Sequence, residues 1–171
     1  MKKILILALA VVMAATMAAC GMGDVGSASS APATSASSQV ASKPSSDSYD
    51  DSLLGLEKYL AANSMISGSA TEMKADFIGA DKGEKYVTSF SGTNNVTIEL
   101  YQFNTDKLSD TAKTVLDSVK KNGTYPIMGQ EVAGTLSNSG KYLMVYKDTV
   151  TADTNKAHEK EVIALVQNFK S

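Results

Sequence analysis

The stretch 96–103, Val96-Thr97-Ile98-Glu99-Leu100-Tyr101-Gln102-Phe103, decides the fold of this chain. Its side chains alternate between two faces, and most of them are β-branched, aromatic or long aliphatic groups, which favour extended structure. One face carries Val96, Ile98 and Leu100, and the other carries Thr97, Glu99, Tyr101 and Phe103. We therefore predict a β-strand over this stretch.

A second extended run comes before this strand. Lys85 to Ser91 places Tyr86, Thr88 and Phe90 on one face. The residues between the two runs, Ser91-Gly92-Thr93-Asn94-Asn95, include glycine and asparagine, which tolerate the positive φ angles of tight turns. The two runs together predict an antiparallel hairpin.

Three segments carry apolar residues at helical spacing. The first runs from about Asp51 to Ala62, and Asp51 or Ser52 can cap its free amides. The second begins at Ser109 and closes at Lys120-Lys121-Asn122-Gly123, because cations and a following glycine suit a helix C-terminus. The third begins near Asp153 or Thr154. Their apolar stripes are Leu53, Leu56 and Leu60; Ala112, Val115, Leu116 and Val119; and Val162, Leu165, Val166 and Phe169.

A second hairpin is predicted from Gln130 to Leu136 and from Lys141 to Lys147, with its turn at Ser137-Asn138-Ser139-Gly140. A short strand is also predicted through Met73, Ala75 and Phe77. The units made of a hairpin and its following helix lie about 47 residues apart, and their apolar positions partly match. This offset suggests an internal repeat.

The predicted order is helix, hairpin, helix, hairpin, helix, that is α-ββ-α-ββ-α. It indicates a single α+β domain with an antiparallel sheet of about four strands and about three helices that cover one face. The other face would then be less covered. Tyr101 and Phe103 are therefore the candidates for a surface that meets a partner.

The N-terminus has the layout of a secretory signal. Lys2 and Lys3 precede an uncharged apolar run from Ile4 to Ala15, and small residues follow it. Met17-Ala18-Ala19-Cys20 resembles the lipobox of bacterial lipoprotein precursors. A small domain behind a linker rich in serine and alanine also resembles small Gram-positive lipoproteins, and this resemblance is specific over residues 1 to about 50. The resemblance implies cleavage after residue 19, a diacylglyceryl thioether on Cys20, further acylation such as palmitate, and stable anchoring on the extracytoplasmic face of the cell membrane. An uncleaved signal anchor and a soluble secreted product are the alternatives.

Composition divides the chain into three parts. Residues 1–19 are the predicted signal peptide, and residues 20–50 hold Cys20 and a linker rich in serine and alanine. The linker has almost no large apolar groups to offset the entropy of ordering it, so we expect a flexible spacer. Residues 51–171 are long enough for one globular domain with its own core.

The predicted domain has few groups that suit catalysis. His158 is the only histidine, and its charged neighbours Lys156 and Glu159 indicate a surface position. Cys20 is the only cysteine and is assigned to the anchor, so zinc sites and Cys-His or Ser-His-Asp catalysis are not expected. Carboxylate pairs remain as a route to catalysis. The aromatic residues of the hairpins are interpreted as core: Tyr86, Phe90, Tyr101, Phe103, Tyr142 and Tyr146.

Charge and loop composition favour neither nucleic-acid nor metal binding. The chain has a net charge of -2 and contains no arginine or tryptophan. Without a basic patch, a nucleic-acid partner is not expected. The acidic loops at Asp81-Lys82-Gly83-Glu84 and from Asp148 to Asn155 lack the spacing of a calcium loop, so we interpret them as turns. No cofactor is expected.

The sequence thus predicts a membrane-anchored, non-enzymatic domain that binds an envelope protein or a wall component. A small solute-binding lipoprotein is the first alternative, and a tyrosine-lined pocket would favour it. A hydrolase that uses paired carboxylates is the second, and two acids in one cleft would favour it.

Overall fold

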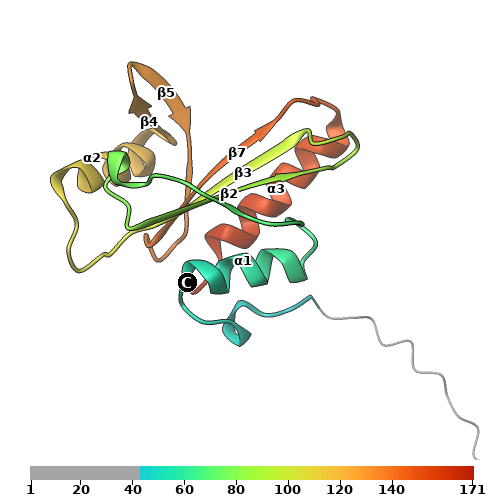
Figure 1. The fold of residues 1–171 in the computed structure, drawn as a ribbon, viewed down its shortest axis with the longest axis horizontal. Coiled ribbons are helices and arrows are strands. Elements are labelled where there is room, and N and C mark those ends of the chain that lie inside the picture. The colour runs from blue at the N-terminus through green and yellow to red at the C-terminus, as the bar shows by residue number, and fades with distance from the viewer. Residues whose placement is uncertain (1–42) are drawn as a thin grey trace, which may run out of the picture. The chain divides into compact units, whose positions relative to one another are not determined.

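The computed structural model describes residues 43–171, which form a single α+β domain (Figure 1). The predicted signal peptide, Cys20 and most of the predicted linker lie outside the described residues. The elements in chain order are η1 (Ser46–Ser48), α1 (Leu53–Ala62), β1 (Thr71–Glu72), η2 (Asp76–Ile78), β2 (Lys82–Thr88), β3 (Val96–Gln102), α2 (Asp110–Asn122), β4 (Thr124–Ile127), β5 (Gln130–Ala133), β6 (Thr135–Leu136), β7 (Tyr142–Asp148) and α3 (Asp153–Gln167).

The main sheet has five strands in the order β1-β2-β3-β7-β6, and all neighbours are antiparallel. Its central strand is β3, which covers residues 96–102 of the predicted strand 96–103. Leu100 of β3 lies opposite Glu84 of β2 on one side and Met144 of β7 on the other. β4 and β5 form a separate two-stranded sheet. The prediction of about four strands in two hairpins is therefore wrong in strand number and order.

One face of the sheet is closed by α1 and α3, and Figure 1 shows both helices beside it. We call it the α1/α3 face. Its strand residues are fully buried among leucines of α1 and the apolar stripe of α3, with Tyr142 and Phe169 in edge-to-face contact. The residues with 0% exposure on this face include Leu56, Leu60, Val96, Ile98, Leu100, Met144, Val162 and Val166.

The opposite face is covered by α2 together with β4, so the expectation that all helices cover one face is wrong. We call it the α2 face. Tyr101, Leu143 and Val145 pack there against the α2 stripe, and Tyr125 of β4 completes the cluster. This cover extends over only part of the sheet, because Val87 on the same face is 48% exposed and Lys147 is also exposed.

Capping residues mark the start of α1 and both ends of α2, as predicted. Ser52 accepts a hydrogen bond from the amide of Gly55 at 3.1 Å, and Ser109 accepts one from Ala112 at 3.1 Å. Each satisfies an amide that has no partner within its helix. Gly123 ends α2 in the left-handed conformation, with φ of 70°.

Two predicted strands differ in the structure. The segment through Met73, Ala75 and Phe77 is not a strand: β1 ends at Glu72, and η2 contains Phe77. The predicted strand from Gln130 to Leu136 is split at Gly134 between β5 and β6, which belong to different sheets. A Cβ at Gly134 would lie 2.9 Å from Leu143 Cδ1, so glycine leaves room for this leucine where the chain passes from one sheet to the other.

The suggested repeat does not extend to the packing. β2 and β6 lie on opposite sides of the central pair β3 and β7, as two related hairpins would. However, α2 packs on one face of the sheet and α3 on the other. A two-fold axis through the central pair would place both helices on the same face, so the two units are not equivalent.

The folded part begins before residue 51. Tyr49 lies next to Tyr59 of α1, with ring centroids 5.6 Å apart, and Lys43 forms an ion pair with Glu161 of α3. Residues 43–50, predicted as part of the flexible linker, therefore contact the domain through the Tyr49 ring and the Lys43 ammonium.

Candidate functional site

The largest cavity described is an apolar groove of about 500 Å³ between η2, α2 and the turn that joins β4 to β5. We call it the α2 groove. Its floor and walls are mainly carbon atoms, and its polar groups come from the first turns of α2. The lining residues are Phe77, Ile78, Asp110, Thr111, Thr114, Val115, Pro126, Ile127 and Met128.

Met128 lies at the tip of the β4–β5 hairpin. Ile127 pairs with Gln130, which leaves Met128 and Gly129 as a two-residue turn with φ angles of 49° and 80°. Positive φ at both positions is the geometry that suits the right-handed twist of a hairpin, and it is unusual for methionine. The Met128 side chain is 99% exposed. A large apolar group is thus displayed at the end of a short, well-paired ribbon.

Phe77 supplies the opposite wall of the groove and is 48% exposed. Its position is fixed by Gly79, which ends η2 with φ of 75°. A Cβ at Gly79 would lie 2.5 Å from Ser109 Oγ and 2.7 Å from the Ala112 amide nitrogen. This close approach of backbone to helix requires glycine and holds η2 against the N-terminus of α2.

The rim of the α2 groove carries few charges. Asp110 is fully exposed and pairs with Lys113 one turn later at 3.3 Å. Its backbone carbonyl accepts a hydrogen bond from the Thr114 hydroxyl at 2.9 Å. Exposed pairs of this kind contribute little to stability. The groove therefore offers apolar contact area bordered by hydroxyls and one carboxylate.

Tyr101 and Phe103, the predicted partner-surface residues, are buried. Their exposed fractions are 2% and 0%, because α2 and β4 cover the end of the sheet from which they project. The Tyr101 hydroxyl donates to Glu99 at 3.1 Å, and burial raises the pKa of this phenol well above its usual range. The prediction that these two residues meet a partner is therefore wrong.

The prediction that the aromatic residues of the hairpins form core is confirmed. Four of the six are buried, and two are half-buried against the α1/α3 cluster. The buried members are Tyr86, Tyr101, Phe103 and Tyr142, and the half-buried members are Phe90 and Tyr146.

His158 is buried as well, which contradicts the predicted surface position. It is 6% exposed and stacks on Phe90, with ring centroids 3.9 Å apart. Its Nε2 atom is buried without a hydrogen-bond partner among the described residues. Burial lowers the pKa of His158, although Glu161 and Asp148 act in the opposite direction. The neutral imidazole therefore serves as a flat packing group.

Asp148 organises the polar contacts beside this ring. Its carboxylate accepts hydrogen bonds from Asn95 at 2.8 Å, from Asn155 at 2.7 Å and from the Val150 amide at 2.8 Å. Desolvation alone would raise the pKa of Asp148, but these three donors lower it below its usual value. The network joins the β2–β3 loop, the end of β7 and the start of α3. Asp148 therefore has a structural role.

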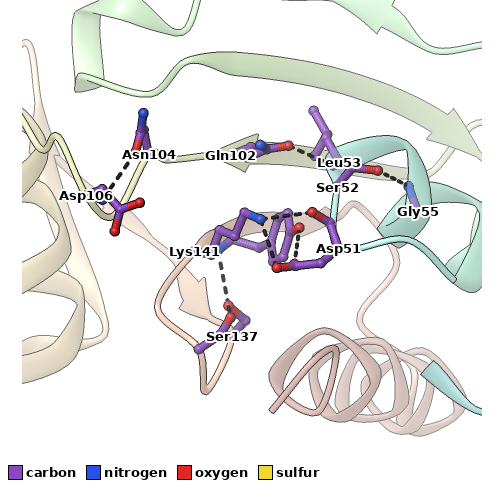
Figure 2. Close-up of polar contacts among 11 residues, drawn as sticks. Asp51, Ser52, Leu53, Gly55, Gln102, Asn104, Asp106, Ser137 and Lys141 are labelled. Atoms are coloured by element: carbon purple, nitrogen blue, oxygen red, sulfur yellow. Dashed lines mark hydrogen bonds and ion pairs between the residues drawn. The ribbon is translucent and has the colours of Figure 1, made fainter. Parts of the chain in front are cut away.

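A second polar cluster fastens the N-terminal side of α1 to the sheet. Figure 2 shows Asp51 facing Lys141, with the Gln102 side chain directed at Leu53. Lys141 Nζ lies 2.9 Å from Asp51 Oδ2 and donates to the Asp51 carbonyl at 2.8 Å, while the Tyr142 hydroxyl donates to Oδ1 at 2.7 Å. Burial alone would raise the pKa of Asp51, but the contacts with Tyr142 and Lys141 lower it below its usual value. We call this arrangement the Asp51 clamp.

Three carboxylates border a hollow of about 390 Å³ beside the clamp, namely those of Asp51, Asp81 and Asp106. Asp51 is already bound to Lys141 and Tyr142. Asp81 and Asp106 are the two carboxylates that remain at this hollow, and both are exposed to solvent, which does not favour the proton donor that hydrolysis by paired carboxylates requires. Among residues 43–171, no group of three or more histidine, cysteine or acidic side chains is placed to hold a metal ion. The α2 groove is therefore the better candidate site.

The comparisons with known proteins assign neither a family nor a function. No family model matches the chain, and neither a curated protein nor a solved structure is significantly similar to it. In the part of the chain that the structure describes, no helix has both the length and the apolar character needed to cross a bilayer. The site must therefore be interpreted from its own geometry.

Sequence reasoning missed the residues that form the α2 groove. Phe77 was assigned to a strand, and Pro126 was treated as a break before the second hairpin. The one available signal was the tetrapeptide Pro126-Ile127-Met128-Gly129. A glycine that follows two apolar residues is compatible with a turn that exposes one of them, but nothing local distinguishes it from an ordinary loop.

Proposed function

We propose that this protein is a membrane-anchored, non-enzymatic binding domain that takes an apolar segment of another envelope protein into the α2 groove. The lipid on Cys20 would hold it at the extracytoplasmic face of the membrane. The observation that carries the binding role is the exposure of Met128 and Phe77, at 99% and 48%, on the two sides of one groove.

The openness of the groove favours a protein partner over a small solute. Small-molecule sites enclose most of the ligand surface and use a few converging polar groups. Here one wall ends in a fully exposed methionine, and the Asp110 side chain is also fully exposed. A ligand in this groove would remain partly open to solvent, whereas a protein segment would cover Met128 and Phe77 with its own surface.

Methionine suits such a role because its side chain is flexible and polarizable. It adapts to partners of different shape, and it occurs often at protein-binding surfaces. Apolar residues that stand singly on a surface need no functional explanation. Met128 differs because Ile127, Pro126 and Phe77 continue the apolar surface beside it.

The proposal is tested by site-specific photo-crosslinking of the full-length chain in bacterial cells. The crosslinker replaces Met128 in one variant and Leu54 in the matched control, because Leu54 is a 57% exposed apolar residue on α1, outside the groove. We expect one discrete protein adduct from position 128 and none from position 54. The additional change Phe77→Ser should remove the adduct.

Equal adducts from both positions, or an adduct that survives Phe77→Ser, would contradict binding in the groove. The anchor is tested separately by Cys20→Ala, which should release the chain from the membrane fraction. Loss of the adduct in this variant would show that binding requires the membrane location. Retention of the Cys20→Ala chain in the membrane fraction would overturn the anchor alone.

A further inference from the structure

The outer edge of β7 is only partly paired. β6 pairs with β7 at two positions, Thr135 with Met144 and Leu136 with Leu143. The chain before β6 leaves the sheet at Gly134 and continues into the separate β4–β5 ribbon. Figure 1 shows the β4–β5 ribbon projecting away from the sheet, while β7 continues towards α3. β5 lies near part of β7, but no strand pairing joins the two. From Val145 to Asp148, β7 therefore pairs with β3 alone.

The hydrogen-bond pattern shows which backbone groups lie on this edge. The Phe103 amide donates to the Lys141 carbonyl, and the Thr149 amide donates to the Asn95 carbonyl. Odd-numbered residues of β7 therefore direct their backbone groups at β3. The Ser137 amide donates to the Tyr142 carbonyl on the other side. By alternation, the amide and carbonyl of Tyr146 and those of Asp148 point to the unpaired edge.

A groove of about 370 Å³ runs along this edge. One wall is the end of β7 and the residues that follow it, and the other is the first half of α3. An extended peptide could lie on the strand and direct alternate side chains at the helix, which is the geometry of recognition by strand addition. The lining residues are Tyr146, Lys147, Asp148, Val150, Thr151, Asn155, Lys156 and Glu159.

The charges at this edge determine which charge on an added strand would be attracted. Lys147 is exposed, whereas Lys156, with a side chain that is 62% exposed, pairs with Asp153 at 3.5 Å. Lys147 is therefore the cation that faces the edge without such a pair among residues 43–171. The Asp148 carboxylate is already bound by three donors, so Glu159 is the remaining anion of the groove. A second copy that paired antiparallel about Lys147 would place two lysines opposite one another, which is unfavourable. An acidic side chain opposite Lys147 would be attracted.

We propose that the free edge of β7 accepts an extended, acidic segment of a partner protein as an added strand. This site is separate from the α2 groove and does not depend on the function proposed for it. Backbone hydrogen bonds to Tyr146 and Asp148 would supply affinity, and Lys147 would select the charge of the incoming strand.

The test uses the full-length, isotope-labelled chain and a pair of short acetylated peptides of alternating threonine and valine. One peptide has a central glutamate, and the other has lysine at that place. We expect the glutamate peptide to slow amide hydrogen exchange at Tyr146 and Asp148, and to bind about threefold more tightly than the lysine peptide. Amides of Val145 and Lys147, already bonded to β3, should not change.

The matched variants reverse one charge each. Lys147→Glu should invert the preference between the two peptides, whereas Lys82→Glu, at an exposed lysine of β2, should leave it unchanged. The proposal is overturned if neither amide is slowed at the highest soluble peptide concentration, or if Lys147→Glu leaves the preference as it was. Concentration-dependent protection of the two amides without peptide would assign the edge to a second copy and would also overturn it.

Discussion

The two faces of the sheet are closed to different degrees. On the α1/α3 face, two helices cover the strands, and Val96, Ile98 and Leu100 are fully buried. On the α2 face, one helix and β4 cover Tyr101 and Val145, while Val87 stays 48% exposed. The fully closed face holds the larger of the two buried apolar clusters, so we expect it to contribute more to stability. The incompletely covered face carries the α2 groove and the exposed side chain of Lys147.

The largest effect is expected from a cavity in the closed face. Leu100→Ala removes a side chain with 0% exposure and should lower the free energy of unfolding by about 2–5 kcal/mol. Val87→Ala, a change to an exposed side chain on the α2 face, should change it by no more than about 0.5 kcal/mol. Urea unfolding of both variants measures the difference. Equal losses would contradict the difference in closure between the α1/α3 face at Leu100 and the α2 face at Val87.

A smaller effect is expected where η2 meets α2. Gly79→Ala and Gly129→Ala both place a Cβ at positive φ, which costs about 1–2 kcal/mol. Only the Cβ at residue 79 also meets backbone, since nothing lies within 4 Å of the one at residue 129. Gly79→Ala should therefore lose about 1–3 kcal/mol more than Gly129→Ala. Thermal unfolding measures the loss of stability in both variants. Equal losses would show that η2 shifts away from α2 without a further energetic cost.

The smallest effect is a pH dependence that originates at His158. Burial lowers the pKa of this imidazole in the folded chain below its value of 6.5 in the unfolded chain. The unfolded chain therefore binds more protons as the pH falls below 6.5, and stability should decrease until the folded-state pKa is passed. His158→Phe keeps a ring against Phe90 and should lack this decrease. Urea unfolding midpoints at about pH 7.5 and about pH 5 measure the loss of stability in each chain. The same loss in the wild-type and His158→Phe chains would refute a role of His158.

The central part of the fold could be predicted because its signals are local. The alternation in residues 96–103 predicted β3, and the serine caps and Gly123 predicted the ends of the helices. Which face a helix covers is decided by non-local packing, so α2 could not be assigned to its face from its own stripe. For the same reason, Tyr101 and Phe103 were expected at a surface that α2 covers.

The candidate site was less predictable than the core. Pro126 lowers the strand propensity of β4, so the ribbon depends on contacts beyond β4 itself: its pairing with β5 and the burial of Tyr125 against α2. Gly134 within the predicted strand is compatible with a bend, but nothing local indicates that the two halves belong to different sheets. His158 carries charged neighbours in the sequence, but at helical spacing these lie on other sides of α3, and the ring itself faces Phe90.

The Asp51 clamp determines how a pulling force would enter the molecule. If the chain is held from its N-terminal side and drawn away by a bound partner, the tension reaches the sheet at the residue where the N-terminal segment meets it. That residue is Asp51, bonded to Lys141 and Tyr142 at the start of β7. Because β7 is paired along its length with β3, the tension is shared by the middle of the sheet and does not peel away a terminal strand.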